Sequence, residues 1–204
     1  MTWTEYIKTN RNRVELTVTI LFLIISLVSL ANFLNFVEER SGVILPDPVL
    51  DLFNPVDLTW LTFGLIYFSI LFAVYSLINK PVQLVFAFQL YTIMVIIRMT
   101  AMYLLPLEPP EKMIVLSDPV VEYFGTGRAL TKDLFFSGHT ATLFILYLVT
   151  ENKPIKHVFL VCMAIVALLV LLQHVHYTID IFAAIFFTYS AFAFLKYLRR
   201  IVNQ

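Results

Sequence analysis

The sequence is poor in charged residues and in cysteine, and each shortage excludes a class of protein. Charged residues make up only 14% of the 204-residue chain, whereas a soluble domain of this size needs more polar cover for its surface. The single cysteine, Cys162, excludes an internal disulfide and leaves the redox compartment undetermined. The formal net charge is zero, which gives no support for nucleic-acid binding.

Apolar residues are correspondingly abundant. They make up 60% of the chain, the mean hydropathy is +0.85, and there are 19 phenylalanines and 10 tyrosines. This composition indicates an all-α polytopic membrane protein, because roughly 20 apolar residues are needed to cross the hydrocarbon. The first apolar stretch begins too late and is too long for a secretory signal, so we expect a permanent helix. We expect one catalytic domain, residues 1–204, with six spans at 14–34, 57–78, 82–105, 134–150, 156–174 and 177–198.

Basic residues are distributed unequally between the two sides of this predicted bundle. Cytoplasmic segments of membrane proteins are enriched in Lys and Arg, so the richer side, which holds both termini, is expected to be cytoplasmic. The loops 35–56 and 106–133 would then face outward, and the compact length favours a bacterial inner membrane. The richer side holds Lys8, Arg11, Arg13, Lys80, Lys153, Lys156, Lys196, Arg199 and Arg200, and the other holds Arg40, Lys112, Arg128 and Lys132.

Three of the four histidines fall at the outward end of the predicted spans. His176 and Asp180 are four residues apart, so on a helix they share a face and can hydrogen-bond. A carboxylate on one ring nitrogen fixes the tautomer and makes the other nitrogen a better nucleophile or base. His139 would add a second imidazole across the helix pair. His157 lies at the opposite end and is expected to be a spectator.

Ser137 and Gly138 precede His139 at the start of a predicted helix. Backbone N–H groups and the helix dipole attract phosphate at such a terminus, and Gly138 leaves room for close backbone approach. These residues together predict a phosphoryl-transfer site. Plainer interpretations stay open: Ser137 or Asp133 as an ordinary helix cap, or a histidine as a packing hydrogen-bond donor. A metal site is disfavoured, because no further Cys or carboxylate ligand is clearly placed.

Several ordered motifs resemble one known family. The segment "FSGHT" (136–140) followed by "HVHYTID" (174–180) resembles the sphingomyelin synthase branch of the type 2 phosphatidic acid phosphatase superfamily. The segments "ILPDPVLD" (44–51), "RMTAMYLLPLEPP" (98–110) and "KDLFFSGHT" (132–140) are similar to further motifs of that branch. The resemblance extends over residues 40 to 195, and its motifs are specific in combination rather than singly.

This resemblance implies six helices, an active site on the luminal or outer face, and transfer of a phospho-headgroup from a glycerophospholipid to ceramide. It makes His176 the nucleophile that forms a phosphohistidine and Asp180 the residue that orients it. His139 becomes the acid for the departing diacylglycerol and then the base for the incoming hydroxyl. No metal or other cofactor is needed. The implied partners are the glycerophospholipid donor, ceramide or another lipid acceptor, and the membrane, with self-association left open.

The sequence also departs from the superfamily's usual pattern. Phe136 and Val170 stand where its phosphatase branches usually carry Pro and Arg, and a Lys…Arg-Pro motif is missing. Loss of these basic groups favours the synthase branch and leaves the phosphate ligand open. Arg98 is the candidate, because a guanidinium can pair bidentately with phosphate. An ion pair with an outer-loop acid, or snorkelling to the interface, is the alternative.

Other residues accompany the motifs. Asp133 is expected to hydrogen-bond His139 or to cap its helix. Tyr103 is a candidate substrate contact, although an interfacial anchor is favoured for it and for Tyr177. His174 is expected to support the site from off the His176 face. Asp47 is expected to hold a turn of the outer loop.

Two other functions remain open at this stage. Water in place of ceramide would give a lipid phosphatase or a phospholipase C-type hydrolase at the same His-His-Asp site. A transporter or scaffold is disfavoured, because the ionisable groups gather at one face and the mid-membrane segments are apolar. The acids of the long 106–133 loop could face a cationic headgroup such as choline or ethanolamine, or could simply be solvated.

Overall fold

The computed structural model describes residues 1–117 and 129–202 of the chain. In these two stretches the fold is all-α, with seven α-helices and one short 3₁₀ helix, η1. The elements are α1 (Trp3–Tyr6), α2 (Asn10–Glu39), η1 (Leu50–Leu52), α3 (Thr59–Leu77), α4 (Pro81–Leu104), α6 (Gly138–Val149), α7 (Lys153–Leu172) and α8 (Thr178–Val202).

Five helices, α2, α3, α4, α7 and α8, are long and apolar enough to cross a membrane. By length and composition they make the chain a multi-pass membrane protein. The bounds of these helices lie close to the predicted spans. The main difference is at α2, which extends past the predicted 14–34 at both ends. Polar residues such as Asn10 and Glu39 continue this helix beyond its apolar stretch. Because the span was predicted from apolar residues alone, these polar ends of the helix were not included in it.

The predicted span at 134–150 needs correction. α6 has only 12 residues, so at 1.5 Å per residue it is about 18 Å long, against the roughly 30 Å of a hydrocarbon core. The helix begins at Gly138, because the side chain of Ser137 caps it by accepting the amide of Thr140. The apolar residues 134–136 precede this cap in irregular chain. The described residues therefore contain five long helices and one short apolar helix in place of six full spans.

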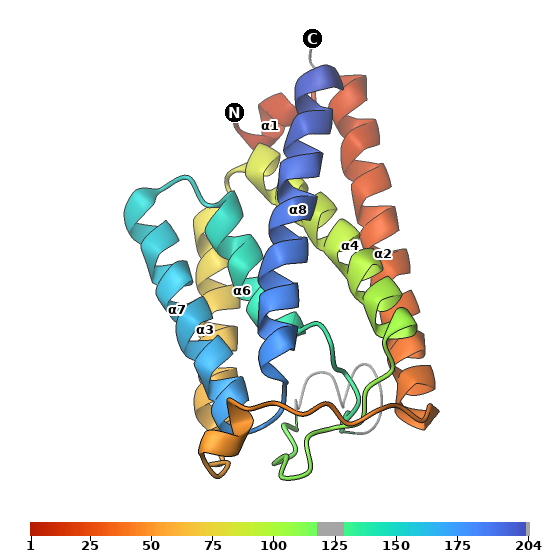
Figure 1. Ribbon diagram of the computed structural model, residues 1–204. Coiled ribbons are helices and arrows are strands. Elements are labelled where there is room, and N and C mark those ends of the chain that lie inside the picture. The colour runs from red at the N-terminus through yellow and green to blue at the C-terminus, as the bar shows by residue number, and fades with distance from the viewer. Residues whose placement is uncertain (118–128, 203–204) are drawn as a thin grey trace.

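α6 lies at the centre of the bundle, with α3 and α7 on one side and α2, α4 and α8 on the other (Figure 1). Ala141 and Ile145 on one face of α6 join a buried cluster built mainly from α2, α4 and α8. Leu143 and Phe144 join a second cluster, built mainly from α3 and α7. The shortest apolar helix therefore connects the two halves of the core.

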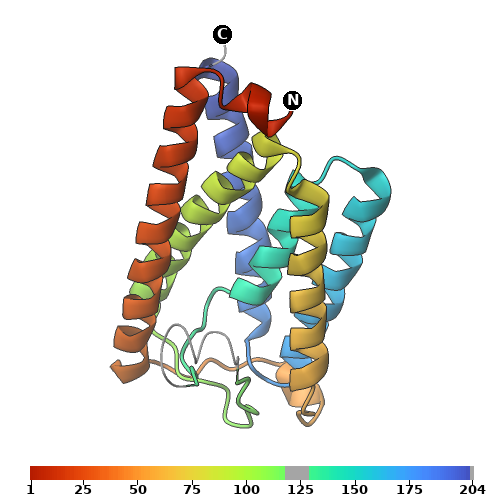
Figure 2. The same cartoon turned by 180° about the vertical axis from the view of Figure 1, so that it is seen from behind.

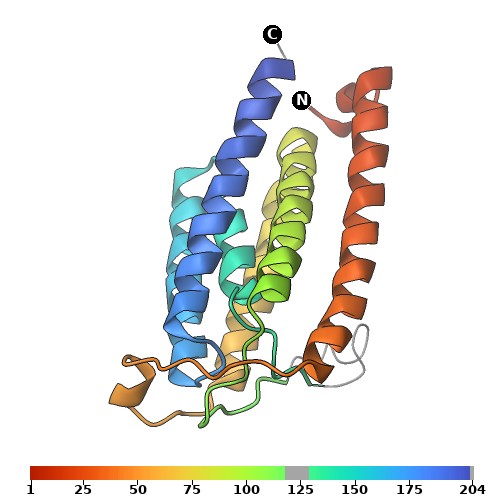
Figure 3. The same cartoon turned by 45° about the vertical axis from the view of Figure 1, so that its right-hand side comes forward.

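The start of α6 lies inside the bundle. Seen from behind, α6 begins part-way along α3 and α7 and not level with their ends (Figure 2). Both termini and α1 lie at the opposite end of the bundle from the long loops (Figure 3). His139, in the first turn of α6, is therefore recessed on the side of the long loops.

The two long loops are joined to each other at this end. Val43 and Leu107 form a parallel bridge, and a Cβ on Gly42 would lie 2.5 Å from the carbonyl carbon of Leu107, so a side chain does not fit there. A carboxylate oxygen of Glu108 accepts the amide of Gly42 at 2.8 Å and the ammonium of Lys132 at 2.9 Å. These contacts join the first loop, the second loop and the segment that leads into α6.

Candidate active site

His176 and Asp180 form a buried pair at the start of α8. Nδ1 of His176 lies 3.0 Å from Oδ2 of Asp180, and their side chains are 2% and 0% exposed. The same carboxylate oxygen accepts the amide of Tyr177 at 3.1 Å, which fixes its position. Because this oxygen accepts the amide hydrogen of Tyr177, its contact with Nδ1 is the geometry of an Nδ1–H donor, which leaves Nε2 facing away from the carboxylate. This arrangement gives a nucleophile or base at Nε2.

His139 faces this pair from the first turn of α6. The ring centroids of His139 and His176 are 6.3 Å apart with an interplanar angle of 64°. Phe63 of α3 lies edge-on to His139, with the centroids 6.1 Å apart. The structure thus brings together one imidazole from α6, a second from the turn before α8 and one carboxylate from α8.

Ser137 holds the two helix starts together. Its hydroxyl caps α6, and its amide donates to the carbonyl of Asp180 at 3.3 Å. Ser137 is fully buried. This bond places the positive end of the α6 dipole next to the start of α8, where His176 lies.

Arg98 occupies the space beside Gly138. A Cβ on Gly138 would lie 2.7 Å from Cζ of Arg98 and 2.8 Å from both terminal nitrogens. The room that the sequence assigned to phosphate is therefore used, at least in part, by the guanidinium. Nε of Arg98 donates to the carbonyl of Phe136 at 3.2 Å, and Nη2 pairs with Asp133. Arg98 is only 7% exposed, so this cation is held inside the bundle against the first turn of α6.

The remaining predicted residues divide between the site and its periphery. Asp133 pairs with Arg98, which is the ion pair with an outer-loop acid given as the alternative for Arg98. The cap of α6 is Ser137, so the alternative of capping by Asp133 is wrong, and the expected hydrogen bond to His139 stays a prediction. Tyr103 is 59% exposed, and its described contacts are with Arg40, whose guanidinium lies 5.4 Å from the ring centroid. Tyr177 is 2% exposed, so its expected role as an interfacial anchor is also wrong.

Tyr177 and His174 hold the loops beside the site. The hydroxyl of Tyr177 donates to the carbonyl of Glu108 at 3.0 Å and accepts the amide of Leu45 at 3.3 Å. His174 has a positive φ of 56°, is 3% exposed and packs edge-on against Phe53 at 5.2 Å. His174 and Tyr177 therefore contact the loops, whereas His176 of the same segment contacts Asp180.

Asp47 does more than hold a local turn. Its carboxylate accepts the amide of Val49 at 3.0 Å, as a turn requires, and also the amide and hydroxyl of Thr178 at 2.6 and 3.0 Å. Burial acts to raise the pKa of Asp47, but the hydrogen bonds from Thr178, Val49 and Leu50 outweigh it and hold the pKa below its usual value. The ionised side chain stabilises the positive start of α8.

Gln173 is a structural residue that sequence reasoning missed. It is 1% exposed and joins three segments that meet at the end of α7. Its side-chain oxygen accepts the amide of Leu58 at 3.1 Å, and its amide nitrogen donates to Thr59 at 2.9 Å and to the carbonyl of Ile114 at 3.3 Å. A lone amide side chain at the end of an apolar run was the available signal, because a buried amide needs hydrogen-bond partners.

Of the acidic residues discussed for the second long loop, the structure gives contacts for Glu108. Glu108 pairs with Lys132, and this hydrogen bond together with the one from Gly42 holds the pKa of Glu108 below its usual value. Glu108 therefore has protein partners, whereas the sequence left open a cationic headgroup or solvent for the acids of this loop. Asp118 and Glu122 lie outside the described residues.

Comparison with known families gives one match, which covers about a third of the chain. The sequence model of the family described as "PAP2 superfamily C-terminal" matches residues 132–198. That stretch contains His139, His176 and Asp180 but not Arg98, and it is similar to the C-terminal domain of the superfamily. Such a match implies lipid phosphatase or phosphotransferase-type activity in general, and it does not single out the sphingomyelin synthase-like branch. No curated protein matches the chain.

Proposed function

We propose that the protein is a membrane phosphotransferase that moves a phospho-headgroup from a glycerophospholipid to ceramide or a similar lipid alcohol. The observation that carries this proposal is the buried His176–Asp180 pair, with its nucleophilic nitrogen on the side away from the carboxylate and a second imidazole 6.3 Å away. At that separation both rings can contact one tetrahedral phosphate. The superfamily match supports the class of reaction.

In the first step, Nε2 of His176 attacks the phosphorus of the donor lipid. The bond from phosphorus to the diacylglycerol oxygen breaks as the bond to nitrogen forms, and protonated His139 gives its proton to the departing oxygen. The product is a phosphohistidine that carries the headgroup. Asp180 stabilises the positive charge that develops on His176, because it accepts the hydrogen bond from Nδ1.

In the second step, neutral His139 takes the proton of the acceptor hydroxyl. The acceptor oxygen attacks phosphorus, the phosphorus–nitrogen bond breaks, and His176 returns to its starting form. A lipid alcohol as acceptor gives transfer, and water gives hydrolysis. The same site therefore supports a lipid phosphatase or phospholipase C-type reaction, with the acceptor as the deciding difference.

Arg98 and the first turn of α6 are proposed to stabilise the phosphate. The guanidinium lies against Gly138, and the helix start adds a positive partial charge. Positions 136 and 170, where the phosphatase branches carry Pro and Arg, hold Phe136 and Val170, which are 0% and 1% exposed. These two residues belong to the core and offer nothing to phosphate, so we assign the phosphate to Arg98, which lies against Gly138.

The orientation in the membrane is also a proposal. The excess of basic residues at the end that holds both termini supports a cytoplasmic location for that end. The histidines would then act from the outer side of a bacterial inner membrane. We treat residues 1–204 as one catalytic domain, and the central packing of α6 supports this view.

Product analysis tests the proposal directly. Purified protein in mixed micelles would receive labelled phosphatidylethanolamine or phosphatidylcholine, with and without ceramide, and mass spectrometry would resolve the products. We expect the headgroup on ceramide in the wild type and in His157→Ala, whose histidine lies near the far end of α7, and no product in His139→Ala or His176→Ala. Diacylglycerol and free phospho-headgroup without an acceptor product would make the protein a hydrolase. Full turnover in His176→Ala would overturn the site.

A further inference from the structure

The end of α2 contacts the segment that leads into α6. The two carboxylate oxygens of Glu38 accept the amide of Thr131 at 3.1 and 3.0 Å, and one of them also accepts the amide of Lys132 at 3.0 Å. The hydroxyl of Thr131 donates to the same carboxylate. Two consecutive backbone amides and one hydroxyl therefore point at a single side chain from a distant part of the sequence.

The position of Glu38 on its own helix is unfavourable for a carboxylate. It lies in the last turn of α2, where the negative end of the helix dipole repels an anion, and that turn contains no basic residue. The three donors from residues 131 and 132 offset this cost, because hydrogen bonds to an ionised group are stronger than those between neutral groups. A residue that breaks a local preference in this way is a candidate for a functional role.

The next residue of the segment connects this contact to the candidate active site. Asp133 directly follows Lys132, and its carboxylate pairs with Nη2 of Arg98. Nε of Arg98 donates to the carbonyl of Phe136 at 3.2 Å, and the guanidinium lies against Gly138. Asp133 and Phe136 belong to one short stretch of irregular chain before α6. A shift at the start of this stretch would therefore move both partners of Arg98.

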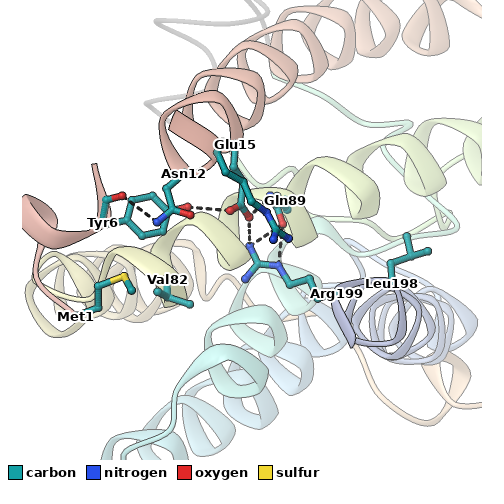
Figure 4. Close-up of a pocket in the computed structure, with 9 residues that line it drawn as sticks. Met1, Tyr6, Asn12, Glu15, Val82, Gln89, Leu198 and Arg199 are labelled. Atoms are coloured by element: carbon teal, nitrogen blue, oxygen red, sulfur yellow. Dashed lines mark hydrogen bonds and ion pairs between the residues drawn. The ribbon is translucent and has the colours of Figure 1, made fainter. Parts of the chain in front are cut away.

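The other end of α2 carries a glutamate with different partners. Glu15 accepts from Arg199 of α8 at 2.6 Å and from Gln89 of α4 at 3.1 Å, beside a cavity of about 420 Å³ (Figure 4). Tyr6 of α1 donates to its other carboxylate oxygen at 3.1 Å. These contacts join helices through their side chains, whereas Glu38 contacts the backbone of the segment beside the histidines.

We propose that Glu38 is a positioning residue for Arg98. Its contacts with the backbone of residues 131 and 132 set the place of Asp133 and Phe136, and these two residues keep the guanidinium against the first turn of α6. The inference rests on the phosphoryl transfer proposed above, in which Arg98 contacts the phosphate. Glu38 acts through Arg98 and does not contact the phosphate itself.

Amide exchange measures the first part of this arrangement without any catalysis. Glu38→Gln keeps the size of the side chain but leaves one acceptor oxygen for the donors of residues 131 and 132, because the new amide group donates where the second oxygen stood. Glu15→Gln makes the same change at the other end of the same helix. Hydrogen–deuterium exchange of purified protein in micelles, read by mass spectrometry, should be faster at residues 131 and 132 in Glu38→Gln and unchanged there in Glu15→Gln.

Initial rates over a range of donor-lipid concentrations measure the effect on Arg98. We expect kcat/KM of Glu38→Gln to fall about tenfold, because misplacement of a positioning group carries costs of this order, and we expect KM to rise. Loss of folded enzyme would lower kcat and leave KM unchanged, so the KM separates positioning from stability. Glu15→Gln should keep the KM of the wild type.

A double variant tests the path of the effect. Asp133→Asn removes the link between the segment and Arg98. The double variant Glu38→Gln/Asp133→Asn should therefore lose less than about twofold in kcat/KM beyond Asp133→Asn alone, as expected for residues that act through one another.

Two results would overturn the role of Glu38. One is wild-type exchange at residues 131 and 132 in Glu38→Gln, and the other is a further tenfold loss in the double variant. Absence of both transfer and hydrolysis in the wild type would overturn the proposed function and, with it, the placement of a phosphate ligand by Glu38. Faster exchange in Glu38→Gln would in that case still support its contact with the segment.

Discussion

The two ends of the bundle each place an arginine against a carboxylate, but in different surroundings. At the histidine end, the side chains of Arg98 and Asp133 are 8% and 20% exposed, next to the start of α6. At the other end, those of Arg199 and Glu15 are 25% and 32% exposed, beside the open cavity. The first cation is fixed against a helix N-terminus, where a reaction needs rigid positioning. The second pair is more exposed, and it lies at the end of the bundle that holds α1 (Figure 1).

The largest expected difference between the two ends concerns their carboxylates. Asp180→Asn keeps the size of the side chain but can donate a hydrogen bond to His176, which allows the wrong tautomer. By analogy with catalytic triads, we expect turnover to fall about 10³- to 10⁴-fold. Glu15→Gln, the same change at the far end, should retain turnover. Initial rates in mixed micelles measure both, and a loss of less than tenfold in Asp180→Asn would remove this residue from the site.

The next difference concerns stability. Arg98→Gln leaves the carboxylate of Asp133 partly buried without its partner, which should cost about 3 kcal/mol of unfolding free energy. Arg199→Gln breaks a more exposed pair and should cost about 1 kcal/mol or less. Unfolding of both variants in mixed detergent and dodecyl sulfate micelles gives the two values. Equal costs would show that burial does not separate the two pairs.

A smaller effect is expected from a single methyl group beside Arg98. Gly138→Ala puts a Cβ 2.7 Å from Cζ of Arg98, so the guanidinium must shift. Since small displacements of a positioning group can cost about 10²-fold, we expect kcat/KM to fall by about 10- to 100-fold. Gly64→Ala is the matched control, because its Cβ would meet no atom within 4 Å. Equal activity of the two variants would mean that Arg98 does not act on the phosphate.

The smallest expected effect depends on pH. The pKa of Asp47 is lower in the folded protein than in the unfolded chain, so its stabilising contribution is complete at neutral pH and is lost as pH falls through the folded pKa. Asp47→Asn should therefore cost about 1 kcal/mol at pH 7, and less as pH falls below about 4. Thermal unfolding at several pH values measures this, with the exposed Asp51→Asn as control. A cost independent of pH would contradict the role of the charge.

Much of the helical frame could be predicted from sequence, because the apolar runs of α3, α4, α7 and α8 coincide with the helices themselves. α6 could not be bounded this way. The apolar residues 134–136 continue its hydropathy, although Ser137 ends the irregular chain and caps the helix. The cap was visible in the sequence, but hydropathy alone extended the span past it. Orientation in the membrane stays a prediction.

Part of the site could be predicted from the sequence, because some of its contacts join residues that are close together in the chain. The contact between His176 and Asp180 was predicted from their four-residue spacing, which is local. The contact is confirmed, although His176 lies in the turn before α8 and not on the helix. The contact between Gly138 and Arg98, and the loop contacts of Tyr177, depend on how distant segments pack. An aromatic residue at a helix end is often an interfacial anchor, and nothing in the local sequence distinguishes that position from a buried one.

Capture of the covalent intermediate tests the central claim most directly. A phosphodiester donor with a p-nitrophenolate leaving group needs no acid, so it should form the adduct even in His139→Ala, whose acceptor step is slow. Intact-protein and peptide mass spectrometry would then locate the headgroup phosphate. The account predicts an acid-labile adduct on His176 that accumulates in His139→Ala and is absent in His176→Ala. An adduct on another residue, or release of p-nitrophenol at wild-type rate by His176→Ala, would contradict it.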